Sequence, residues 1–218
     1  KLLSPGMAEM VVAGQLPVDP DGSVHQASLV MVNIVDFRGL AAGMDSEALV
    51  AFLNRHFDRL AAVVFGHDGM IVHYLGDRLL AVWGLPEPHA DHPLRAVTAA
   101  VEMQHLMEPV NQEREKDELP PIELGIGVTT GTIVAGTIGA QRTRRYTVIG
   151  EAVNEVQAIC ASARPEQVLI GEATFKAVYK QFDIDEVHSL QLGDRSTKCF
   201  EIIGEQEGRP QQPWSYLG

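Results

Sequence analysis

Residues 125–154 constrain the fold of this chain more than any other segment. They read GIGVTTGTIVAGTIG and, after a short basic stretch, RYTVIGEAVN. The β-branched residues favour extended strands, and the glycines permit backbone conformations that other residues resist. We therefore predict a strand, a turn carrying Gly131, a second strand and then a helix from about 151 to 161.

Hydrophobic periodicity predicts the other elements. A nearly continuous apolar run at 28–35 is typical of a strand buried on both faces, and apolar residues at helical spacing follow Asp45 or Ser46. The further predictions are strands at 70–74 and 78–83, a helix opening at Asp91-His92-Pro93, an exposed charged loop at 113–118, and a β-α-β-β tail made of 167–170, 172–179, 182–192 and 198–203.

The 218 residues are enough for one domain with short appendages. We assign 28–203 to the domain, 1–27 to a linking segment after a missing N-terminal region, and 204–218 to a flexible C-terminal tail rich in Pro, Gly and Gln. Helices alternating with hairpins predict an α+β fold: a ferredoxin-like βαββαβ sandwich with a mixed or antiparallel sheet and helices on one face.

Charge and composition exclude several classes of protein. The net charge of −12 argues against a nucleic-acid-binding surface. No run approaches the roughly 20 apolar residues that span a bilayer. Cys160 and Cys199 have no metal-ligand spacing, so we expect buried, reduced thiols in a cytoplasmic protein. Because the chain opens on Lys1, a covalently linked N-terminal sensor domain or membrane anchor fits the sequence.

The first chemical candidate is the Gly76-Asp77 pair between the strands predicted at 70–74 and 78–83. A hairpin turn places this carboxylate at an exposed rim, where a hard cation could be shared with a phosphate. Asp beside Gly is also among the commonest turn pairs. Taken alone, the dipeptide favours the turn interpretation.

Three motifs together resemble the class III adenylate and guanylate cyclase catalytic domain. They are LNRHF at 53–57, the pattern Gly-Asp-x-x-x-Ala-x-x-Gly at 76–84, and the 125–154 block. The resemblance covers roughly 28–203. It implies an antiparallel homodimer that binds a nucleoside triphosphate at its interface, with two aspartates from one protomer holding two Mg²⁺ or Mn²⁺ ions. It also implies attack of the ribose 3′-hydroxyl on the α-phosphorus, with pyrophosphate as the leaving group.

Carried over residue by residue, the resemblance gives an incomplete set of the residues that would hold the metal ions, here called the metal half. Asp77 matches the second metal aspartate, but the first is Asn33. The phosphate loop reads Asp36-Phe37-Arg38 where the family has Gly-Phe-Thr. Asp36 adds a negative charge where the triphosphate would lie.

The half that would hold the base and ribose is incomplete in the same way. Thr147 matches the residue that selects adenine, and Asn154 matches the ribose-binding asparagine. His73 stands in place of the base-reading lysine, and Ala158 in place of the transition-state arginine. A phosphate-binding lysine expected near the C-terminus is also absent from Leu190-Gln191-Leu192-Gly193.

These losses favour a dimerising regulatory module in signal transduction, with little or no cyclase activity. It would bind ATP weakly, and would take Mg²⁺ or Mn²⁺ only together with nucleotide. The alternative is a divergent active adenylate cyclase that makes 3′,5′-cyclic AMP. A diguanylate cyclase is disfavoured, because its Gly-Gly-Asp/Glu-Glu-Phe turn is replaced by 75-LGDRL-79.

Overall fold

The structure, a computed structural model, describes residues 22–140, 142 and 145–205. Most of the predicted N-terminal segment and nearly all of the predicted tail lie outside these residues. The described strands are β1 (Ser23–Ile34), β2 (Met70–Leu75), β3 (Arg78–Trp83), β4 (Leu124–Ile138), β5 (Arg145–Ile149), β6 (Val168–Gly171), β7 (Phe182–Leu192) and β8 (Arg195–Glu205). The helices are α2 (Phe37–Ala41), α3 (Ser46–Gly66), α4 (His92–Lys116), α5 (Glu151–Ser162) and α6 (Glu172–Val178).

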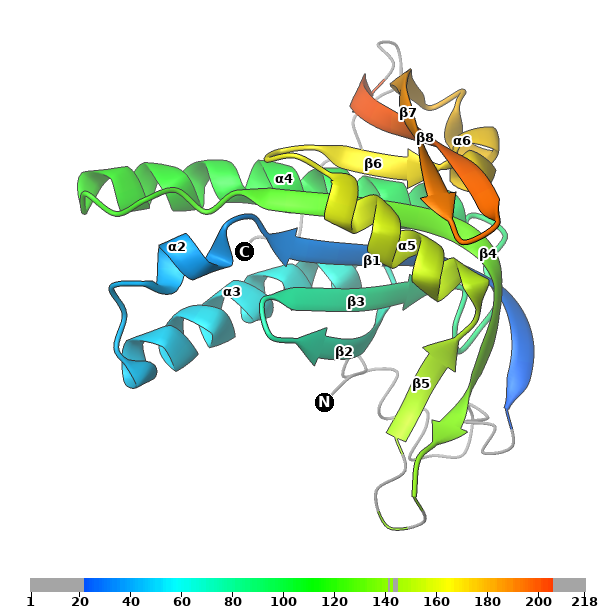
Figure 1. Ribbon diagram of the computed structural model, residues 1–218, viewed down its shortest axis with the longest axis horizontal. Coiled ribbons are helices and arrows are strands. Elements are labelled where there is room, and N and C mark those ends of the chain that lie inside the picture. The colour runs from blue at the N-terminus through cyan, green and yellow to red at the C-terminus, as the bar shows by residue number, and fades with distance from the viewer. Residues whose placement is uncertain (1–21, 141, 143–144, 206–218) are drawn as a thin grey trace.

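The described strands form one sheet in the order β2-β3-β1-β4-β6-β8-β7, and β5 pairs separately with β4 (Figure 1). The strands β2, β3, β1 and β4 pair in antiparallel fashion, and their order is that of a ferredoxin-like βαββαβ unit. β6 adds to β4 in parallel, and β8 and β7 follow antiparallel. The α+β, mixed-sheet prediction is confirmed.

Helices cover both faces of the sheet, which corrects the expectation of one covered face. Residues such as Val30 and Val32 of β1 pack with α3 and α4. The alternate residues Leu29 and Met31 pack in a second cluster that contains α5. β1 is apolar on both faces over 29–32, so water must be excluded from both, and α5 covers the face that the other helices leave open.

Several boundaries match the prediction and three do not. Asp45 caps α3 through Ala48 N at 2.8 Å, as expected. β1 begins at Ser23 rather than 28, and α4 continues to Lys116 through most of the predicted charged loop. β4 also runs unbroken past Gly131, which pairs with Ala27, so the turn predicted there is wrong. A strand partner along its whole length keeps β4 extended there.

Among the described residues, no helix has the length and apolar character needed to cross a lipid bilayer. Cys160 and Cys199 are both buried and free, as predicted.

Candidate functional site

Asn33 and Asp77 lie together at one end of the sheet. β2 and β3 are joined by a two-residue turn in which Gly76 has a φ of 61°, leaving Asp77 next to the end of β1. Ile34 N donates to Asp77 O at 3.4 Å, and Asn33 pairs with Arg78. Figure 1 shows the β2–β3 turn and the end of β1 at the same edge. The two residues predicted for the metal half are therefore neighbours.

The Asn33 side chain is in contact with α5. The thiol of Cys160 donates to Asn33 Oδ1 over 3.3 Å, and Gly125 O lies 3.4 Å from the same sulfur. Burial raises the pKa of Cys160 to about 12. The thiol therefore stays protonated at neutral pH and remains a hydrogen-bond donor. An amide oxygen held in this way is uncharged, and part of its capacity to accept hydrogen bonds or bind a cation is already used.

Arg78 contributes the only described cation in ion-pair range of Asp77. Its Nε lies 3.9 Å from Asp77 Oδ1, and both side chains are partly exposed. The described residues contain no group of three or more His, Cys, Asp or Glu side chains arranged to hold a metal ion. A site with one carboxylate, one engaged amide and a nearby guanidinium does not fit two divalent cations, which require several oxygen ligands and net negative charge.

Asp36 keeps a backbone conformation that usually favours glycine. Its φ is 46° and its ψ is 42°, in the left-handed region. Its Oδ1 accepts from Gly39 N at 3.2 Å at the start of α2. Within that helix, Phe37 packs against the core and Arg38 is exposed. The Asp36 backbone therefore has a conformation that suits glycine, and the residue places a carboxylate at the start of α2.

A β-bulge in β2 determines where His73 points. Ile71 pairs with Ala81 but His73 pairs with Leu80, so Val72 has no partner of its own. Paired residues of antiparallel strands share a face, and Leu80 belongs to the cluster beneath α5. The bulge therefore places His73 on the α5 face, the face that also carries Asn33 and Arg78.

His73 is a neutral group in this position. Burial lowers its pKa below the ordinary value. Its Nε2 is buried and has no hydrogen-bond partner among the described residues. The free imidazole nitrogen can donate or accept one hydrogen bond with a ligand, depending on the tautomer. A neutral imidazole cannot supply the positive charge of a lysine.

The other predicted residues lie on β5 and α5. Thr147 pairs with Gly136 of β4 and is half-buried. It alternates with Val148, which joins the cluster beneath α5, so Thr147 points to the opposite side of β5. Asn154 is exposed on the first turn of α5, and Ala158 follows one turn later on the same side. Alanine there provides no cation.

Asn154 and the residues around Asn33 lie at different ends of α5. Cys160, which touches Asn33, lies six residues after Asn154 on α5, or about 9 Å along the helix axis. Figure 1 shows the start of α5 near β5 and its end near β6. The metal group and the ribose group therefore occupy opposite ends of α5.

Two features of this region were missed by the sequence analysis. Cys160 was predicted only as a core residue, although it holds Asn33. Glu155 joins three elements, since it accepts from Thr129 Oγ1 at 2.7 Å and from Thr197 Oγ1 at 2.8 Å. Both contacts link residues far apart in the chain. The only sequence signal was a glutamate placed among the apolar positions of α5.

Sequence comparisons identify similar proteins. Residues 20–204 match the family model described as the adenylate and guanylate cyclase catalytic domain. The chain is 32% identical to adenylate cyclase 1 of Rhizobium meliloti over 130 residues, which is 60% of this chain and 20% of that protein. It is 34% identical to the uncharacterized protein Rv1319c of Mycobacterium tuberculosis over 158 residues, or 72% of this chain and 28% of that protein. The chain thus spans under a third of these curated relatives.

Structural comparisons agree with this. The guanylyl cyclase Cya2 superposes with a TM-score of 0.80 at 28% identity, covering 89% of this chain and 97% of that one. The adenylyl cyclase CyaB from P. aeruginosa superposes with a TM-score of 0.82 at 20% identity, covering 86% and 98%. The second likeness concerns the fold alone.

Proposed function

This chain belongs to the adenylate and guanylate cyclase catalytic-domain family, and we propose that it acts as a dimerising regulatory module with little or no cyclase activity. The observation that carries the proposal is the state of Asn33. The residue at the first metal position is a neutral amide whose oxygen accepts from the Cys160 thiol at 3.3 Å. Its neighbour Asp77 is the one carboxylate left at that position, and it faces Arg78 at 3.9 Å.

The other losses act in the same direction. Removing one group that stabilises a transition state typically costs on the order of 10²–10³ in rate. Here the transition-state arginine is Ala158 and the base-reading lysine is His73, which burial keeps neutral. Pairing with a second copy does not compensate, because each copy supplies the same impaired halves.

Nucleotide binding would be weak and metal-dependent under this proposal. Cyclases of this family use Mg²⁺ or Mn²⁺ with their nucleotide, and Asp77 would be the remaining carboxylate ligand. Thr147 and Asn154 still suit an adenine nucleotide, so ATP is the triphosphate we expect. Asp36 places like charge beside the phosphates, which at an effective dielectric near 20 costs roughly 4 kcal/mol at about 4 Å, before screening.

We expect the chain to form a dimer even though it has little or no cyclase activity. The two groups of site residues lie at opposite ends of α5, and an antiparallel pair of chains would bring one group from each copy together. We place the module in the cytoplasm as part of a longer signalling protein. Analytical ultracentrifugation at micromolar concentration tests the dimer, and a strictly monomeric species would count against it.

The activity assay uses purified protein with ATP or GTP and Mg²⁺ or Mn²⁺, with cyclic nucleotide quantified by mass spectrometry. We expect no product above background. The matched control for Asp77→Ala is Asp194→Ala, which removes an exposed carboxylate from the β7–β8 turn. Turnover that is abolished by Asp77→Ala but retained in Asp194→Ala would overturn the proposal. Cyclic AMP made from ATP in this pattern would instead establish the alternative, a divergent active adenylate cyclase.

A further inference from the structure

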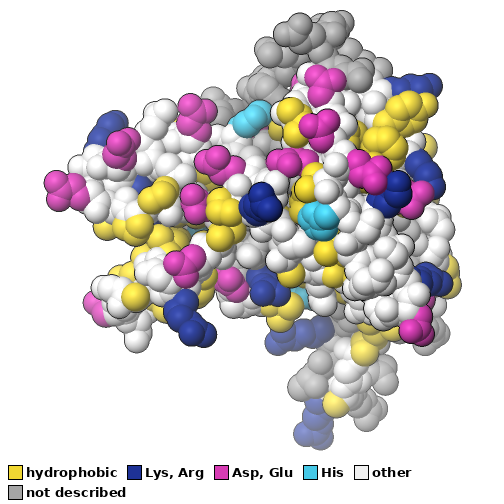
Figure 2. All heavy atoms as spheres, turned by 45° about the horizontal axis from the view of Figure 1, so that its top comes forward, with side chains coloured by type: hydrophobic (Ala, Val, Ile, Leu, Met, Phe, Trp, Pro, Cys, Tyr) yellow, Lys and Arg dark blue, Asp and Glu magenta, His cyan; other side chains and the backbone are white. Residues whose placement is uncertain are grey.

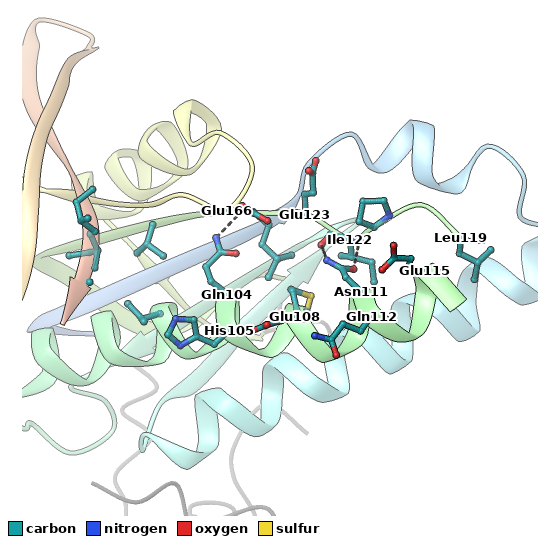
Figure 3. A pocket seen from close by; sticks show the side chains of 18 of the residues that line it. Gln104, His105, Glu108, Asn111, Gln112, Glu115, Leu119, Ile122, Glu123 and Glu166 are labelled. Atoms are coloured by element: carbon teal, nitrogen blue, oxygen red, sulfur yellow. Dashed lines mark hydrogen bonds between the residues drawn. The ribbon is translucent and has the colours of Figure 1, made fainter. Parts of the chain in front are cut away.

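A groove of about 820 Å³ lies between α4 and the end of β8. It belongs to the sheet face covered by α4, whereas Asn33 and His73 lie on the face beneath α5. Figure 3 shows α4 on one side of the groove, with Glu123 and Glu166 across from it. The groove is therefore separate from the cyclase-like site.

One side of α4 forms a long wall of this groove. Its lining residues on that helix extend from Val101 to Glu115. At 1.5 Å per residue, this wall is about 21 Å long. That length matches about four turns of a second helix or a short extended segment.

Hydrogen bonds hold the groove in a fixed shape. Gln104 Nε2 donates to Leu124 O at 3.0 Å and to Gln167 O at 3.2 Å. Further along α4, Asn111 exchanges two hydrogen bonds with the backbone of Ile122, at 2.9 and 2.7 Å. These amides join α4 to β4 and to the start of β6. A ligand would meet a largely preformed surface and would pay little ordering entropy on the protein side.

The groove has a hydrophobic lining. Buried side chains contribute to it, namely Met107, Ile122, Leu124 and Val168. Two large apolar side chains that also line it are open to solvent: Leu119 is 47% exposed and Ile203 is 58% exposed. An occupant that covered both would gain roughly 25 cal/mol for each Å² of apolar surface removed from water.

The charge of the groove has one sign. Among the described residues that line it, none is a lysine or arginine and six are glutamates, namely Glu108, Glu115, Glu118, Glu123, Glu166 and Glu205. None of the six forms an ion pair with another described residue. The nearby Arg114 instead donates to Pro120 O at 2.7 Å and lies over the Phe52 ring on α3. The carboxylates are left without a cation from the described part of the chain.

We propose that this groove binds a basic amphipathic segment of a partner protein. Such a segment would place apolar side chains against Leu119 and Ile203 and its lysines or arginines against the glutamates. Carboxylates that are not neutralised by cations make the electrostatic potential at the surface more negative. This potential steers a cationic ligand towards the groove. The left half of Figure 2 shows acidic and hydrophobic side chains close together, with a few Lys or Arg side chains among them. Apolar burial would supply affinity and the glutamates would select for positive charge.

The test measures binding of a fluorescent lysine–leucine helical peptide of about 14 residues to the 218-residue chain. A glutamate–leucine peptide with the same apolar spacing is the probe control. The groove variant is Glu108→Gln with Glu115→Gln and Glu123→Gln. The matched variant, Asp58→Asn with Glu87→Gln and Asp194→Asn, removes the same charge from positions outside the groove.

We expect the groove variant to bind the lysine peptide about tenfold more weakly, the matched variant to change by less than about twofold, and the glutamate peptide not to bind. Leu119→Ser with Ile203→Ser should also weaken binding. Equal weakening by both charge variants would overturn the proposal, because it would indicate general attraction to an acidic protein. Tighter binding after deletion of 206–218 would overturn it too, since this chain's own C-terminal segment would then be the occupant.

Discussion

The Cys160 thiol donates a hydrogen bond to Asn33 Oδ1 across 3.3 Å, joining α5 to the end of β1. The oxygen that would have to bind a metal is thus held by a helix in the same chain. Gly125 makes this possible, because a Cβ at that position would lie 2.7 Å from Asn33 Oδ1. A change at Asn33 would therefore also disturb its contacts with Cys160 and Gly125.

Under the proposed function, giving four positions the residues that the family motifs have there should produce some turnover. The set is Asn33→Asp, Asp36→Gly, His73→Lys and Ala158→Arg. Asp36→Gly also suits the left-handed backbone at that position. Single restorations should do little, since residues that act as one unit are non-additive. The assay measures cyclic AMP from ATP with Mn²⁺, with Thr147 and Asn154 unchanged.

Circular dichroism should first establish that the fourfold variant and the parent are equally folded. A folded but silent fourfold variant would contradict this prediction. It would mean that the site has also lost its geometry, and that the substitutions accompany inactivity rather than cause it.

Binding of ATP with Mg²⁺ to the unmodified chain should be weak. Under the proposed function, Asn33 offers no carboxylate to a metal ion, His73 offers no positive charge, and Asp36 would repel the phosphates. Isothermal calorimetry with and without Mg²⁺ measures this directly, and Asp36→Gly should tighten binding. Tight, Mg²⁺-dependent binding by the parent would favour a nucleotide-sensing role instead.

The free energy of unfolding should fall in mild acid because of His56. This residue of α3 is 1% exposed, and its ring nitrogens have no hydrogen-bond partner among the described residues. Burial, aided by the charge of Arg59, lowers its pKa to about 4 from 6.5. Between these values the unfolded chain binds a proton that the folded chain does not, so this contribution to stability is present above pH 6.5 and is lost as the pH falls.

At about pH 5 this one group should cost roughly 2 kcal/mol relative to pH 7. Urea unfolding at the two pH values measures the loss, and His56→Phe should reduce it. His105→Gln, at an exposed position on α4, is the control and should leave the pH dependence unchanged. An unaltered pH dependence in His56→Phe would assign the acid sensitivity to other groups.

Gly127→Ala should destabilise the protein strongly. A Cβ there would lie 2.5 Å from Cys160 N and 2.9 Å from its Cα, so α5 would have to move off β4. We expect a loss of about 1–3 kcal/mol in the free energy of unfolding. Gly66→Ala, where nothing lies within 4 Å, should change it by less than about 0.5 kcal/mol. Similar melting temperatures for both variants would contradict the prediction.

Local patterns determined the elements whose own residues specify them. Asp45 predicts the start of α3 because a carboxylate can cap the free amide of Ala48. Gly76-Asp77 predicts the β2–β3 hairpin because a two-residue turn needs a residue that tolerates positive φ. Comparison of the sequence with the family motifs also led to the hypothesis that some site groups are kept and others are replaced.

Tertiary structure decided what depends on partners distant in the chain. Gly131 has the character of a turn residue, yet pairing with Ala27 keeps β4 extended there. The bulge at Val72 moves His73 to the α5 face, because a strand with an extra residue shifts its alternation against its partner. The sequence by itself determined the family and most of the local elements. Only the packing of α5 on β1 decided that Asn33 is held by Cys160, because that contact joins residues 127 positions apart.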